Sequence, residues 1–315
     1  MDTATNGGEV NQTMPAQADE LQTGDILLML GQGPLSDLIA WASDGPYSHA
    51  AMVADAGDLI EASAAGVRRY PLAQRLADQV NYHYIDAFRV HGASGSALSA
   101  GDLGEVLAEA VTMLGIPYPV DQLALLGAIM AVRGKWPVHP LARLLVREAL
   151  DHAVPDDASR VVCSEMVYRA YAECAATPDG RLAPRIIVGE RGDAPFPDID
   201  WKALFDEVWP LLRPPRRQAL QSNMARLNAL KGSDTVGVLA AMGGETVSDG
   251  ELEQARQVVL ARLGATPEAM NGKALMAGAD PVDKRPNPKL VSPQDLAVSP
   301  SVGALGRLMQ RAGGG

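Results

Sequence analysis

A predicted β-hairpin near the start of the chain is the feature that most constrains the fold. Residues 47–53 and 59–63 form two short apolar runs, and the five-residue segment between them, Ala-Asp-Ala-Gly-Asp, is typical of a tight turn. If the hairpin is centred on that segment, Glu61 lies opposite Ala51. Glu61 is then diagonal to His49 on the same side of the sheet, which predicts that the carboxylate and the imidazole can meet.

The residues on both sides of this hairpin predict an α+β fold. Three more extended segments, at residues 24–30, 66–70 and 82–90, complete a small, mainly antiparallel sheet. Short helices are expected at Ser36 and after Pro71. Helical spacing of apolar residues follows at residues 101–114, 123–132 and 141–150, and in the helix that begins at Cys163. We expect the sheet to pack on the helix that bears Cys163.

The two ends of the chain differ from its middle. Apolar periodicity weakens after residue 184, where helical pieces are predicted at 201–212, 215–230 and 249–263, and residues 264–300 are rich in Pro, Gly, Asp and Lys. We expect a disordered N-terminal arm at residues 1–20, a compact domain at 21–184, a helical accessory region at 185–265 and a mostly disordered tail at 266–315.

The charge balance argues against a nucleic-acid partner. The formal net charge is −11, from 27 basic and 38 acidic residues, whereas binding to a phosphate backbone needs a basic stripe. The densest basic cluster is Arg213, Arg216 and Arg217, which we interpret as part of a solvated linker.

The sequence offers neither an export signal nor a membrane span. Residues 1–20 contain no basic segment followed by an apolar one, which predicts a cytoplasmic protein unless it is released by lysis or packaged in a particle. The longest apolar run, residues 123–132, is far shorter than the ~20 residues of a transmembrane helix. We therefore expect no transmembrane segment, with transient contact at a membrane surface left open.

The chain has two cysteines, Cys163 and Cys174. They lie about three turns apart on one predicted helix, too far for a disulfide, and two free thiols fit a reducing compartment. Cys163 begins that helix, where unpaired backbone N–H groups and the helix dipole lower the pKa of a thiol. We interpret Cys163 as a nucleophile and Cys174 as an inert core residue.

Cys163, His49 and Glu61 are together the residue types that nucleophilic catalysis needs. A thiol nucleophile requires a base to take its proton and a third group to orient that base. We assign these three catalytic roles to Cys163, His49 and Glu61 respectively. Tyr47, two residues before His49 and on the same predicted strand face, is a candidate substrate-binding residue. Its hydroxyl is either an oxyanion donor or part of the packing, and packing is favoured.

The other histidines do not suggest a metal site. His83, His91, His139 and His152 have no close partners at metal-ligand spacing. The Gly-rich stretch that begins at Gly31 lacks the Lys and Ser/Thr of a phosphate-binding loop. We predict no metal and no cofactor.

Four short motifs, at residues 24–28, 47–53, 59–62 and 162–167, together resemble a known family. The chain is similar to the circularly permuted, papain-like branch of the NlpC-type cysteine hydrolases, the YiiX and YaeF-like proteins, which are distant relatives of cell-wall hydrolases. In that branch the order is His, an acidic residue and then Cys, as in His49, Glu61 and Cys163. The resemblance covers about residues 21–173. It implies a permuted papain-like fold with the nucleophile on the packed helix.

The same resemblance implies hydrolysis, or acyl transfer, at an amide or ester bond of a peptide or lipid-like acyl substrate. Tyr118 and the apolar segment 123–132 are candidates to line the substrate site, although a buried core helix explains that segment more simply. A different interpretation is a catalytically silent binding or structural module of the same fold, for example a phage or particle component. Its C-terminal helices would then dock to a protein partner that the sequence does not identify.

Overall fold

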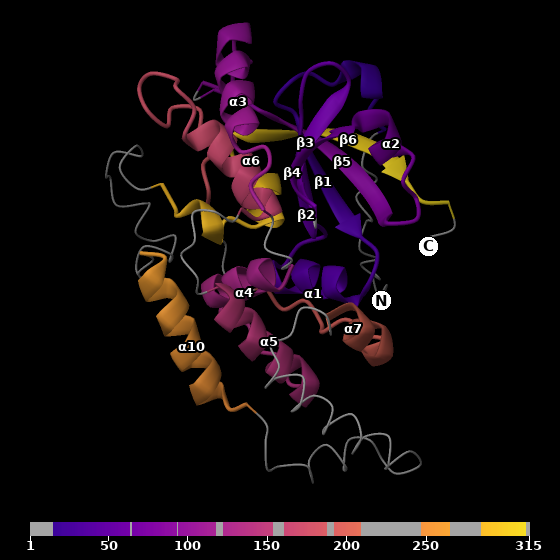
Figure 1. Ribbon diagram of the computed structural model, residues 1–315, viewed down its shortest axis with the longest axis vertical. Helices are drawn as coiled ribbons and strands as arrows, with labels where there is room; N and C mark the ends of the chain where they lie inside the picture. Colours follow the sequence, from indigo (N-terminus) through magenta and orange to yellow (C-terminus); the bar gives the residue numbers. More distant parts are fainter. Residues whose placement is uncertain are drawn as a thin grey trace, which may run out of the picture.

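The fold centres on a six-stranded antiparallel sheet with the order β4-β3-β2-β1-β5-β6 (Figure 1). The computed structural model describes residues 15–63, 65–92, 94–117, 122–153, 161–187, 192–208, 247–264 and 285–312. The strands are β1 (Ile26–Gly31), β2 (His49–Val53), β3 (Asp58–Ser63), β4 (Gly66–Pro71), β5 (Tyr82–Val90) and β6 (Val302–Gln310). Together with the helices, this sheet confirms the predicted α+β class.

The helices agree with the apolar periodicity of the sequence. They are α1 (Pro34–Ala42), α2 (Leu72–Leu76), α3 (Ala100–Thr112), α4 (Gln122–Arg133), α5 (Pro140–Ala153), α6 (Cys163–Ala172), α7 (Trp201–Val208), α10 (Asp249–Arg262) and α12 (Pro293–Ala297), with the 3-10 turns η1 (Ala18–Glu20) and η4 (Pro288–Leu290). One start differs from the prediction, because α1 begins at Pro34 and places Ser36 inside the helix. A proline at the first helical position is well suited to that start. The predicted helix at residues 215–230 lies outside the described residues.

The predicted hairpin has the predicted register. Ala51 of β2 pairs with Glu61 of β3. The turn between the two strands uses left-handed backbone at Ala56 and Gly57, with φ values of 57° and 79°, a conformation that glycine adopts at little cost. The next strand continues the meander, and Arg68 of β4 pairs with Glu61 on the other side.

The sheet is buried on both faces. Successive strand residues point to opposite faces, so that Leu28 and Met52 join the larger core while Leu27 and Ala51 join a smaller one. α6 packs on β2 and β3 and against α3, and Figure 1 shows these two helices on one side of the sheet and α2 on the other. Below them, α4 packs with α1, α5 and α10.

The C-terminal segment is ordered over residues 285–312, where we expected mostly disorder. β6 pairs along β5 as the sixth strand, and η4 and α12 pack against α6. Arg307 of β6 donates hydrogen bonds from Nε (2.7 Å) and Nη2 (3.0 Å) to the buried carboxylate of Asp86 on β5. A buried carboxylate requires such a partner. Because the two residues are far apart in the sequence, local sequence patterns do not predict their pairing.

The expected N-terminal arm is also shorter than predicted. Pro15 forms a parallel bridge with Arg307, and the backbone N–H of Ala16 donates to the Arg307 carbonyl at 2.9 Å. Residues 15–20 therefore lie beside the sheet, and the other residues of the expected arm, 1–14, lie outside the described residues.

α4 is a core helix. Each of its residues from Leu123 to Val132 is buried, and the helices around it account for that burial. Gly127 lies directly against α5, since a Cβ atom built there would come within 2.0 Å of the Ala149 carbonyl oxygen. Among the described residues, no helix combines the length and the apolar character that crossing a bilayer would require.

This close approach generates a stability prediction with a matched control. Gly127→Ala is expected to lower the free energy of unfolding by about 1–3 kcal/mol or more, because the added methyl overpacks the α4–α5 contact. Gly104→Ala, at an exposed position of α3 with open space around it, is expected to raise stability by about 0.5–1 kcal/mol. Urea denaturation of both variants measures the difference, and equal stabilities would contradict the packing described.

Candidate active site

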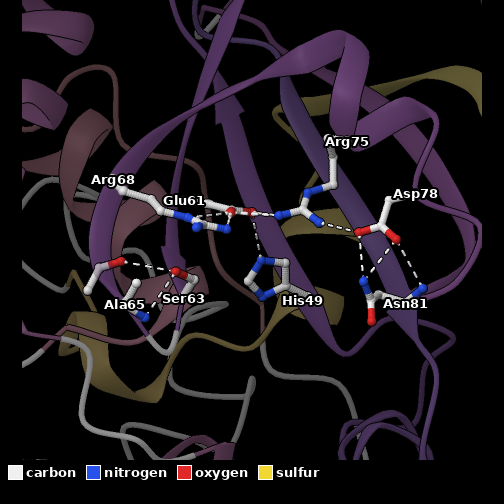
Figure 2. Close-up of polar contacts among 9 residues, drawn as sticks. His49, Glu61, Ser63, Ala65, Arg68, Arg75, Asp78 and Asn81 are labelled. Atoms are coloured by element: carbon white, nitrogen blue, oxygen red, sulfur yellow. Dashed lines mark hydrogen bonds and ion pairs between the residues drawn. The ribbon is translucent and has the colours of Figure 1, made fainter.

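His49 and Glu61 meet as the hairpin register predicts. His49 is the first residue of β2, and its Nε2 lies 3.6 Å from Oε2 of Glu61 on β3 (Figure 2). Both side chains are removed from solvent, Glu61 completely and His49 to 13% exposure. Nε2 forms no hydrogen bond within the described structure, so the contact is an ion pair at slightly more than hydrogen-bonding distance.

Cys163 is the first residue of α6, as predicted, and its thiol is free and buried. The helix begins there because Val162 is extended and its N–H donates to the Glu165 carboxylate at 3.1 Å. The Ser164 hydroxyl adds a bond to the Val291 carbonyl at 2.6 Å, which ties the start of α6 to the C-terminal segment.

The thiol and the imidazole interact electrostatically. Burial opposes a charge on His49, but Tyr82, the Cys163 thiol and Glu61 favour it, and the pKa of His49 is raised well above 6.5. Of the three residues selected from the sequence, Glu61 thus contacts His49 directly, and Cys163 acts on its charge.

Two arginines that we did not predict surround the Glu61 carboxylate. Arg75 of α2 donates from Nη2 to both carboxylate oxygens at 2.6 Å, and Arg68 of β4 donates to Oε1 from Nε at 3.1 Å and Nη2 at 2.8 Å. Figure 2 shows the two guanidinium groups reaching Glu61 from opposite sides. Burial raises the pKa of Glu61, but His49, Arg75 and Arg68 outweigh it and lower the pKa to about 2. The carboxylate is therefore an anion at neutral pH.

Arg75 is itself held tightly. Its guanidinium lies 4.6 Å from the ring centre of Tyr70 and 4.8 Å from that of Tyr82, which are cation–π distances. Its Nη1 donates to Asp78 at 3.0 Å, and Asp78 accepts two bonds from the Asn81 amide. The register of the third strand could have identified Arg68 from the sequence, whereas the approach of Arg75 depends on how α2 packs.

Tyr47 packs in the core, which is the alternative that we favoured over an oxyanion donor. It precedes β2 and packs in the larger core with its ring edge against Phe88, so it does not share the strand face of His49 as we predicted. Its hydroxyl donates to Asp86 at 2.8 Å, and burial together with Asp86 raises the pKa of Tyr47. Tyr118, the other predicted substrate-binding residue, lies outside the described residues.

Histidine, cysteine and acidic side chains form no metal-binding arrangement in the described part of the chain, where no group of three or more is placed to hold an ion. The charged groups that contact the Glu61 carboxylate from β4 and α2 are guanidinium groups. Guanidinium has no lone pair to offer a metal.

Comparisons with known proteins show only a distant structural similarity. No protein-family model matches the chain, and no curated protein matches it in sequence. The chain is similar to the crystal structure of the metalloprotein YiiX from Escherichia coli O157:H7, with a TM-score of 0.40 and 17% identity over 91% of this chain and 98% of that chain. At this TM-score the similarity supports no argument about chemistry, and membership of the NlpC-type superfamily is not shown.

The lowered pKa of Glu61 generates a prediction about stability and pH. Ionised Glu61 stabilises the fold above its ordinary pKa of 4.5, and this contribution is lost as the pH falls towards about 2. Glu61→Gln is expected to cost about 3–5 kcal/mol at pH 7, since two arginines lose their charged partner. The cost should shrink between pH 4.5 and pH 2.

Urea denaturation across this pH range measures both effects. Glu173→Gln is the control, because Glu173 pairs with Arg169 at the surface and is expected to change stability by less than about 1 kcal/mol at any pH. A pH-independent cost of Glu61→Gln would show that the carboxylate is not held as an anion.

Proposed function

We propose that this protein is a thiol hydrolase that cleaves an amide or ester bond. The observation that supports the proposal is the position of the Cys163 thiol at the start of α6, together with its electrostatic interaction with the His49 imidazole, whose Nε2 faces a buried carboxylate. Each partner favours the charged form of the next: Glu61 stabilises the His49 imidazolium, and the imidazolium stabilises the thiolate.

The proposed reaction uses each residue in turn. His49 accepts the thiol proton, the Cys163 thiolate attacks the carbonyl carbon, and the resulting imidazolium protonates the leaving amine or alcohol. Water then attacks the acyl-enzyme with His49 as base and releases the acid. The backbone N–H of Cys163 is a candidate donor to the oxyanion, because the first N–H groups of a helix have no intrahelical acceptor.

The substrate class follows from the resemblance found in the sequence. We propose a peptide or lipid-like acyl substrate. We also propose that the protein acts in a reducing compartment, because both thiols are free. Transfer of the acyl group to an acceptor other than water uses the same acyl-enzyme and belongs to the same proposal.

A second candidate function is a binding module without catalysis. It is favoured by the burial of the Cys163 sulfur, since that residue has no exposed surface. A sulfur that no substrate reaches would serve only to pack the sheet against α6.

Alkylation with iodoacetamide at different pH values distinguishes the two functions. If Cys163 is paired with His49, it is expected to react well below pH 8.5, the ordinary pKa of a thiol. Cys174 is an internal control, because burial raises its pKa and restricts its reaction to alkaline pH. The rates are measured at each site by peptide mass spectrometry on the folded protein. Equal alkaline profiles, or no reaction at Cys163, would favour the binding module.

Hydrolysis is tested directly with libraries of acyl-peptides and lipid esters. Cys163→Ala and His49→Gln are each expected to lower kcat/KM by about 10³-fold or more. Cys174→Ala is expected to leave it unchanged, since this thiol is a core residue that contacts its own helix end. Turnover that survives Cys163→Ala would overturn the assignment of the nucleophile.

A further inference from the structure

We propose that Arg75 is a positioning residue of this site, which holds both oxygens of Glu61 beside His49 and whose positive charge sets the pH range in which His49 and Cys163 act. The catalytic meaning of this inference rests on the proposed function. Its structural part concerns only Arg75, Glu61 and His49.

The hydrogen bonds of Glu61 are distributed unevenly between its two oxygens. Oε1 accepts three bonds, two from Arg68 and one from Arg75, whereas Oε2 accepts one, from Arg75. The oxygen with fewer bonds is the one that lies 3.6 Å from Nε2 of His49. Arg75 thus bridges the two oxygens, and the two additional bonds from Arg68 go to Oε1, so that Oε2 is the oxygen that faces the imidazole.

Arg75 is the more rigid and less screened of the two arginines. Its side chain is 6% exposed, compared with 39% for Arg68. It is fixed by the rings of Tyr70 and Tyr82 and by Asp78. A charge excluded from water acts on its neighbours through a lower effective dielectric.

The direction of its effect follows from the charges that face His49. These are Glu61 on β3, Cys163 on α6 and Tyr82 on β5, with Arg75 on α2 and Arg68 on β4 beyond the carboxylate. A positive charge disfavours protonation of every titrating group near it. Removing Arg75 is therefore expected to raise the pKa of His49 and that of Cys163 together.

The test compares three variants of the full chain. Arg75→Met removes the charge, Arg75→Lys keeps it, and Arg69→Met is the matched control. Arg69 is on the same strand as Arg68 but pairs with Asp55 and Asp58 outside this network. The first readout is the NMR titration of the His49 imidazole, assigned with His49→Gln. The second is the pH midpoint of Cys163 alkylation.

Arg75→Met is expected to move both midpoints upward by roughly one pH unit. With Arg75→Lys, both midpoints are expected to lie close to their wild-type values. Arg69→Met is expected to leave both midpoints unchanged. If Arg75→Met does not fold, Arg68→Met serves instead, and a smaller upward shift is expected because that arginine is more exposed. Unmoved midpoints in folded Arg75→Met, or a larger shift in Arg68→Met, would overturn the inference.

The two readouts separate this inference from the proposed function. If His49 shifts while wild-type Cys163 reacts only at alkaline pH, Arg75 positions the pair but the protein is not a thiol hydrolase. If Cys163 is activated and hydrolysis depends on it, but Arg75→Met moves neither midpoint, the proposed function holds and Arg75 is only structural.

Discussion

The buried negative charge of Glu61 is the interaction on which this part of the molecule depends. A carboxylate without solvent must be compensated by charges or hydrogen bonds, since removing it from water costs several kcal/mol. Here β2, β4 and α2 each supply one partner: His49, Arg68 and Arg75. The short helix α2 contributes little core of its own, and the ion pair and the stacked tyrosines explain its place beside the sheet. The carboxylate thus fixes both the fold of this region and the direction in which the imidazole points.

Buried carboxylates paired with arginine also join other distant parts of the chain. Asp86 on β5 holds Arg307 of the C-terminal strand, and Asp295 on α12 holds Arg133 of α4 at 2.8 Å. In each pair the acidic residue is buried, so loss of its partner would leave a charge in the core. Such pairs add little net stability over apolar packing, but they penalise alternative arrangements of the segments they join. They specify which strand or helix lies next to which.

The setting of Cys163 combines local and distant contributions. The helix start and the Glu165 cap are local, while the Ser164 bond to Val291 and the packing of η4 come from residues more than one hundred positions later. The C-terminal segment is therefore part of the support of the helix that bears the thiol. The side chains at the start of α6 are thus held in place by the fold itself, which is what the proposed function would require.

Features that depend on near neighbours could be predicted from the amino-acid sequence. The turn chemistry around Ala56 predicted the register that brings Glu61 to His49, and apolar spacing predicted the helix that starts at Cys163. These predictions succeeded because the interactions act within one hairpin or one helix turn. Only the tertiary structure decided that Arg75 reaches Glu61, that Tyr47 turns to Asp86, and that β6 completes the sheet. Those contacts join segments separated by up to 226 positions, from Tyr84 to Gln310, and the charge and burial that select them exist only once the chain has folded.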